Sequence, residues 1–210
     1  VWARENTRQD IYAAFKRREV YATTGPRISV RLFGGFGFDE GAADANNLAE
    51  IGYRQGVPMG GDLTRPSTPD SKAQFLMHAV KDPKGANLDR VQVVKGWLDS
   101  TGKSHEQVFN VSWSGDRQLD AEEKLVAVGD TVDQVVPSYT NSIGAAELST
   151  VWEDPTFDVN QRAFYYVRVL QIPTPRHSLY DAVALQIDPP EEGPAVIQER
   201  AYTSPIWYTP

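Results

Sequence analysis

Apolar side chains recur at helical spacing near the start of the chain. Ile11 and Phe15 fall on one face of a helix, separated by one turn. Thr7 is suited to cap the amino end, and Asp10 three residues later forms an imperfect capping box, because Glu or Gln is usual there. The spacing predicts one helix over residues 7–18, with an apolar stripe that needs a partner surface.

Beyond this helix the pattern changes to alternation of apolar and polar residues, which is typical of half-buried strands. Gly and Pro residues punctuate the runs and indicate turns between them. The predicted strands are residues 20–23, 28–32, 73–80, 90–96, 107–114, 146–152, 163–172 and 182–187. Many short strands with almost no later helix predict a mainly β fold, an antiparallel β-sandwich that is immunoglobulin-like or jelly-roll-like.

Two stretches lack either period and are predicted to be long loops. Residues 34–54 are rich in glycine at first and polar later, and residues 60–72 are crowded with Gly, Pro, Ser, Thr and Asp. Connections of this length are usually functional, packed on themselves or disordered. The glycines of the first stretch miss the spacing of a phosphate-binding loop, so we do not expect a nucleotide site there.

Composition narrows the class of partner. The 210 residues carry a net charge of −7, which argues against nucleic acid, because neutralising phosphates requires clustered Lys and Arg. The basic run at residues 16–18 is short and is followed by Glu19, so we interpret it as the solvated end of the helix. No apolar run approaches the length of a membrane span. The chain has no cysteine, which excludes disulfides and cysteine-ligated metals.

The histidines do not form a metal motif. His78, His105 and His177 are far apart in the sequence, and no His-x-His pair occurs. We interpret His78 as a structural strand residue and His105 as part of an exposed turn. No metal site is therefore predicted in this chain.

Several stretches carry a resemblance to a known family. Residues 2–8 read Trp-Ala-Arg-Glu-Asn-Thr-Arg, and residues 18–28 read Arg-Glu-Val-Tyr-Ala-Thr-Thr-Gly-Pro-Arg-Ile. Further matching stretches are residues 56–63, 81–90, 163–170 and 201–208. Together they resemble the C-terminal part of a bacterial family catalogued as domain of unknown function number 3604.

Longer members of that family resemble the PHP superfamily (polymerase and histidinol phosphatase), in particular its carbaryl-hydrolase-like branch. The resemblance implies an upstream β/α barrel that binds divalent metal ions, followed by a β-sandwich. Residues 1–27 would be the last helix and strand of the barrel, and residues 28–210 the sandwich. The metal ligands would lie before Val1, so this chain would hold no cofactor itself. An exported location, periplasmic or secreted, is also implied.

Some residues are candidates for contact with such an active site. Glu5 could orient a group there, and Arg27 beside Thr24 could offer a bidentate fork to an anionic substrate. The alternatives are that Glu5 pairs with a neighbouring arginine on the surface and that Arg27 is a strand-end charge.

A second candidate group follows Pro175. Arg176, His177 and Tyr180 stand in a stiffened segment where their side chains could converge. We keep His177 as a catalytic contributor, and Arg176 and Tyr180, with Thr24 and Arg27, as substrate-binding candidates. A structural role for all of them stays open.

Three functional hypotheses follow. The first is an accessory sandwich of a metal-dependent hydrolase acting on an ester, amide or phosphoester, with the upstream barrel as its partner and no catalysis of its own. The alternative is a non-catalytic module that binds a glycan or an envelope partner through the loops or exposed tryptophans. Four tryptophans would serve this second role unless they belong to the core: Trp97, Trp113, Trp152 and Trp207. The third hypothesis is a homo-oligomer formed through the exposed N-terminal helix.

Overall fold

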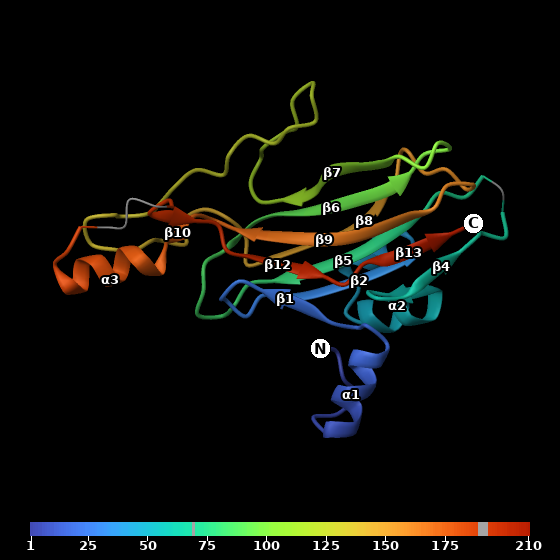
Figure 1. Ribbon diagram of the computed structural model, residues 1–210, viewed down its shortest axis with the longest axis horizontal. Coiled ribbons are helices and arrows are strands. Elements are labelled where there is room, and N and C mark those ends of the chain that lie inside the picture. Colours follow the sequence, from blue (N-terminus) through green and yellow to red (C-terminus); the bar gives the residue numbers. More distant parts are fainter. Residues whose placement is uncertain (69, 189–192) are drawn as a thin grey trace.

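The computed structural model describes residues 1–68, 70–188 and 193–210, and these form two layered β-sheets with helices at the periphery (Figure 1). The larger sheet has the order β1-β12-β9-β13-β4, and β6 joins it by pairing with both β9 and β7. Its strands are β1 (Tyr21–Thr23), β4 (Asp62–Thr64), β6 (Leu88–Leu98), β7 (Ser104–Trp113), β9 (Ala163–Gln171), β12 (Arg200–Thr203) and β13 (Ile206–Thr209). Its neighbours run antiparallel except for β4 and β13, which are parallel.

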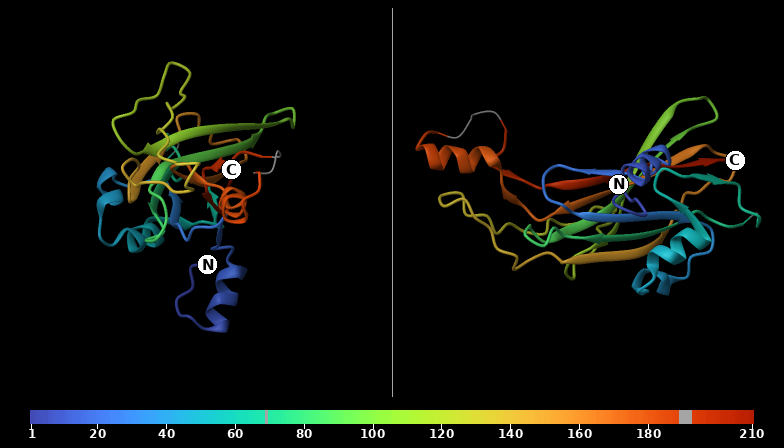
Figure 2. Two further views of the ribbon diagram at one scale, coloured as in Figure 1. Left: turned by 90° about the vertical axis from the view of Figure 1, so that its left-hand side faces the viewer. Right: turned by 90° about the horizontal axis from the view of Figure 1, so that it is seen from below.

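The smaller sheet has the order β3-β2-β5-β8 and is antiparallel throughout. Its strands are β2 (Ser29–Gly35), β3 (Gly56–Pro58), β5 (Gln74–Val80) and β8 (Glu147–Glu153). A separate two-stranded ribbon is formed by β10 (Thr174–Pro175) and β11 (Val196–Ile197). The predicted mainly β, antiparallel sandwich is thus confirmed, and Figure 2 shows its two sheets as stacked layers.

The core lies between the two sheets. In β9, Tyr165, Val167 and Val169 are buried and alternate with less buried neighbours. Phe75 and Met77 of β5 approach them from the smaller sheet in the same apolar cluster. Because side chains of a strand alternate between its two faces, this single cluster defines which face of each sheet is inward.

The predicted N-terminal helix is confirmed as α1 (Arg8–Lys16). The Thr7 hydroxyl accepts a hydrogen bond from the Asp10 backbone N–H at 3.2 Å, as the capping pattern predicted. Within α1 the buried residue is Ala14, and the helix projects away from the sheets (Figure 1). The apolar stripe of this helix therefore remains largely uncovered.

The prediction that residues 34–54 form a loop is wrong. The stretch contains the end of β2, a 3-10 turn at Glu40–Asp44 and helix α2 (Leu48–Gln55). Leu48 and Gly52 of α2 are buried, and a side chain at Gly52 would collide with the ring of Phe33. A glycine at the packing face weakens the apolar pattern, which is why the helix did not stand out in the sequence.

Two further predictions are corrected. Residues 182–187, predicted as a strand, belong largely to helix α3 (His177–Leu185), which buries Leu179 and Ala182 one turn apart. A short apolar run does not distinguish a strand from a buried helix face. Residues 60–72 were predicted as a loop but include strand β4. The helices within the described ranges are all too short or too polar to span a bilayer.

Candidate functional site

The chain leaves α1 through a sharp turn that buries a charged residue. Arg18 has φ +60°, a left-handed conformation, and the next residue, Glu19, is 2% exposed. Its carboxylate accepts hydrogen bonds from the Tyr53 hydroxyl and from the Arg17 guanidinium, at 3.1 Å for Nη2. The Arg31 guanidinium lies 3.9 Å away. The basic run at residues 16–18 is exposed, as predicted, whereas the acidic residue that follows it is buried.

An aromatic side chain from the first residues completes this cluster. The Trp2 indole N–H donates to the Val30 carbonyl at 2.8 Å. The Arg31 guanidinium carbon lies 3.3 Å from the centre of the Trp2 ring, a close cation–π contact. We call Trp2, Arg17, Glu19, Arg31 and Tyr53 the junction cluster. Burial is the main reason that the pKa of the Tyr53 phenol is raised above its usual value, and the hydrogen bond to Glu19 raises it further.

Backbone packing fixes the same junction. Gly60 has φ +83°, and a side chain there would collide with the carbonyl of Arg18. The Arg18 guanidinium also pairs with Asp62 of β4 at 2.8 Å. The carboxyl end of α1 is thus attached to both sheets, through Arg31 of β2 and Asp62 of β4.

The opposite face of α1 is open to solvent. Tyr12 is 61% exposed and Phe15 is 58% exposed. An open groove of about 820 Å³ follows this face and is lined by Asn6, Thr7, Arg8, Gln9, Ile11, Tyr12 and Phe15. Glu5 precedes the N-cap Thr7, is exposed, and is not among the residues that line this groove.

The turn with Thr24 and Arg27 follows β1. The Thr24 hydroxyl bonds to the Glu199 carboxylate and accepts from the Arg200 backbone N–H at 3.0 Å. The Arg27 backbone N–H donates to Asp82 at 2.7 Å, while its side chain is largely exposed. Backbone donors from Arg27 and Lys84 lower the pKa of the Asp82 carboxyl.

The other predicted group lies on α3. Arg176 precedes the helix, His177 is its first residue and is exposed, and Tyr180 is half exposed. Burial raises the pKa of Tyr139, and the neighbouring Tyr180 and Asp82 raise it further.

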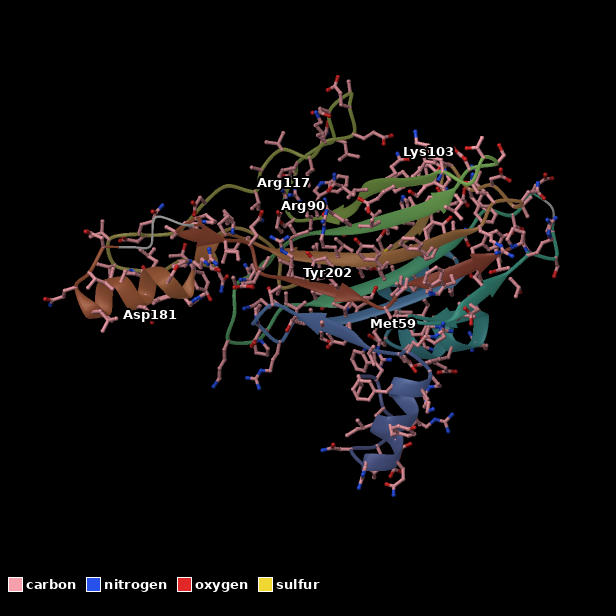
Figure 3. All side chains as sticks on the ribbon, in the orientation of Figure 1. Met59, Arg90, Lys103, Arg117, Asp181 and Tyr202 are labelled. Carbon is pink, nitrogen blue, oxygen red and sulfur yellow. The ribbon has the colours of Figure 1, made fainter. Side chains whose placement is uncertain are left out.

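The predicted candidates lie in three places. Thr24 and Arg27 are on the turn that follows β1, and Arg176, His177 and Tyr180 are at α3, whose Asp181 is labelled in Figure 3. Glu5 lies in the segment that leads into α1. Among the described residues, no hydrogen bond or ion pair joins these three places. The sequence prediction missed Glu19, and its only signal was an acidic residue after a basic run.

Two of the three histidines, His78 and His105, have carboxylate partners, and the described parts of the chain contain no group of residues that could hold a metal ion. His78 in β5 pairs with Glu147 at 2.8 Å. His105 pairs with Asp99 at 2.7 Å and stacks on Trp97, ring centres 5.3 Å apart. His105 thus lies in strand β7 and not in an exposed turn, so that interpretation is corrected. The hydrogen bond from Thr101 is the main reason that the pKa of the Asp99 carboxyl lies well below its usual range. Hydrogen bonds from His105 and Lys103 lower this pKa further.

The fold and the junction cluster together define a β-sandwich protein with a projecting helix whose carboxyl end is attached to both sheets. The whole chain, residues 1–210, matches the sequence model of the family described as "Protein of unknown function (DUF3604)", and the chain belongs to that family. No curated protein and no solved structure matches it.

Proposed function

We propose that this chain is the accessory β-sandwich of a PHP-like, metal-dependent hydrolase and is not catalytic by itself. In this proposal the helix within residues 1–27 packs on a β/α barrel of the same polypeptide, and residues 28–210 support that barrel. Strand β1, which lies within residues 1–27, pairs with β12 and is shared with the sandwich. The barrel would hold the divalent metal ions and cleave an ester, amide or phosphoester. The observation that carries the proposal is the exposed apolar face of α1.

The exposure of α1 is unusual for a helix of a folded protein. A surface helix normally turns its apolar stripe toward the core, which supplies most of its stability. Here Tyr12 and Phe15 point to solvent while Ala14 makes the buried contact. A second domain packed on this face would cover the two aromatic side chains.

The junction cluster supports the same proposal. Glu19 is held by Arg17, which directly follows α1, by Tyr53 of α2 and by Arg31 of β2, so contacts of this buried carboxylate set the direction in which α1 leaves the sandwich. A helix that is exposed only to solvent would not require a fixed direction. A helix that binds a second domain does, because the angle between the helix and the sandwich determines where that domain lies.

Chemical labelling of tyrosine tests this proposal. Tyr12 should react readily with a nitrating reagent in the 210-residue chain, because its ring is mostly exposed. In the complete natural polypeptide that contains this chain, Tyr12 should be protected at least about fivefold, as expected for a side chain in a packed interface. Tyr180 is the matched control, since it is half exposed and lies on α3.

Two outcomes would contradict the proposal. Equal reactivity of Tyr12 in both polypeptides would show that no domain covers α1. Protection already present in the 210-residue chain, together with a dimeric mass, would assign the α1 face to a second copy and favour the homo-oligomer.

A further inference from the structure

Four aromatic side chains form a row across the outward face of the larger sheet. Phe164 and Tyr166 alternate with buried residues of β9, and Trp207 alternates with buried residues of β13. Tyr202 of β12 extends the row. Ring centres are 6.4 Å apart for Tyr202 and Tyr166, 6.5 Å for Tyr166 and Phe164, and 5.3 Å for Phe164 and Trp207. We call these four residues the aromatic row.

The row ends in a groove. It has a volume of about 660 Å³ and is lined by the ends of β6 and β13 and by the beginnings of β7 and β9. The C-terminus is marked at this end of the sheet in Figure 1, and Lys103, which precedes β7, is labelled in Figure 3. Its lining residues are Gly96, Trp97, Leu98, Ser104, His105, Glu106, Arg162, Ala163, Phe164, Trp207, Tyr208 and Thr209. Trp207 is 43% exposed, whereas Trp97 and Trp152 are half-buried and pack against the core. Trp113 is also half-buried, and its indole N–H donates to the Arg117 carbonyl at 2.7 Å. Of the four tryptophans considered from the sequence, Trp207 is thus the one that faces solvent.

Part of this arrangement has a structural explanation. Gly96 pairs with Phe164 across β6 and β9, and a side chain at Gly96 would collide with the Phe164 ring. Phe164 therefore covers a glycine in the middle of the sheet, which is a known way to stabilise such a position. That explanation does not extend to Trp207, whose ring lies beside Phe164 on the next strand and remains exposed.

Polar groups line the groove around these rings. Arg162 and Glu106 are both exposed and carry opposite charges, and Ser104 and Thr209 add hydroxyl groups. His105 is held in place by Asp99 and by stacking on Trp97. The groove thus offers donors and acceptors in similar number, with no excess of either charge.

This combination points to one class of ligand. An aromatic ring has a negative face, which attracts the polarised C–H groups on the flat side of a sugar ring. The hydroxyls of a sugar both donate and accept, so they suit a mixed set of polar side chains. A nucleic acid would require an excess of cationic residues, and the groove has Arg162 balanced by Glu106.

We propose that the groove and the aromatic row bind a neutral oligosaccharide, with a sugar ring stacked on Trp207 and its hydroxyls bonded to Arg162 and Glu106. This site is separate in its residues from the α1 face. The proposal goes beyond the accessory role and does not depend on it.

Affinity electrophoresis tests the site on the 210-residue chain. Gels containing soluble neutral polysaccharides (mixed-linkage β-glucan, xylan and glucomannan) should retard the protein on at least one of them. Calorimetry with oligosaccharides from that polymer then gives the dissociation constant. Trp207→Ala should weaken binding at least about tenfold, because exposed aromatic anchors dominate such contacts. Trp207→Phe should retain a large part of it.

Tyr12→Ala is the matched control, because Tyr12 is an exposed aromatic residue outside the groove. This variant should bind the oligosaccharide with unchanged affinity. Arg162→Ala, a change at an exposed residue, should weaken binding by about tenfold through loss of a charged hydrogen bond. It serves as the second variant if Trp207→Ala does not fold. Failure of all three polysaccharides to retard the protein would overturn the proposal. So would equal affinity of Trp207→Ala, or of Arg162→Ala where the tryptophan variant does not fold.

Discussion

Asp154→Ala is expected to destabilise the sandwich by about 3–5 kcal/mol, the cost of breaking a buried ion pair from one side. The Lys95 ammonium lies 2.6 Å from the Asp154 carboxylate, and the two side chains are 2% and 0% exposed. Thr156 and the Tyr165 hydroxyl, at 2.7 Å, complete the hydrogen bonds of Asp154. Removing the carboxylate leaves the Lys95 charge in the core without its counter-charge. Urea denaturation measures the loss.

A double variant distinguishes the ion pair from simple packing. Lys95→Met combined with Asp154→Leu should be much less destabilising than Asp154→Ala, because no uncompensated charge remains. If Asp154→Ala cost less than about 1 kcal/mol, the range of an ordinary surface substitution, the burial of this pair would be contradicted.

Glu19→Ala is expected to lower the free energy of unfolding by about 2–3 kcal/mol, the range for removal of a buried carboxylate that accepts charged hydrogen bonds. The loss is smaller than at Asp154, because the Arg17 guanidinium is 45% exposed and water can solvate it once the carboxylate is gone. The variant should also loosen α1. Faster amide hydrogen exchange across residues 8–16 measures this second effect.

Glu19→Gln provides the matched control. The amide oxygen still accepts from the Tyr53 hydroxyl, while the charge that Arg17 and Arg31 face is removed. We expect a stability loss of about half that of alanine. Unchanged exchange of α1 in Glu19→Ala would show that the junction cluster does not orient the helix.

The sequence was sufficient for the sandwich, and the reason is visible in its strands. In β2, buried Val30 and Leu32 alternate with the polar residues Ser29 and Arg31, so the period of two is visible in the sequence. The hydrogen bond that caps α1 was also predictable, because Thr7 bonds to Asp10, only three residues away. Helix α2 was missed because its contact with Phe33 requires a glycine, which carries no apolar signal.

The buried charged residues could not be predicted from the sequence for a different reason. Glu19 is buried by Tyr53, 34 residues away, and Lys95 bonds to Thr156, 61 residues away. No local pattern distinguishes such charges from solvated ones. The aromatic row likewise combines β9, β12 and β13, whose order in the sheet was not predicted.

Elemental analysis for divalent metals tests the accessory role most directly. It should be applied to the 210-residue chain and to the complete natural polypeptide that contains it, both purified without chelator. We expect stoichiometric metal in the natural polypeptide and none retained by the 210-residue chain, with metal-dependent cleavage of ester or phosphoester probes in the former alone. Stoichiometric metal in the 210-residue chain, or the absence of metal from the natural polypeptide, would contradict the proposed accessory role.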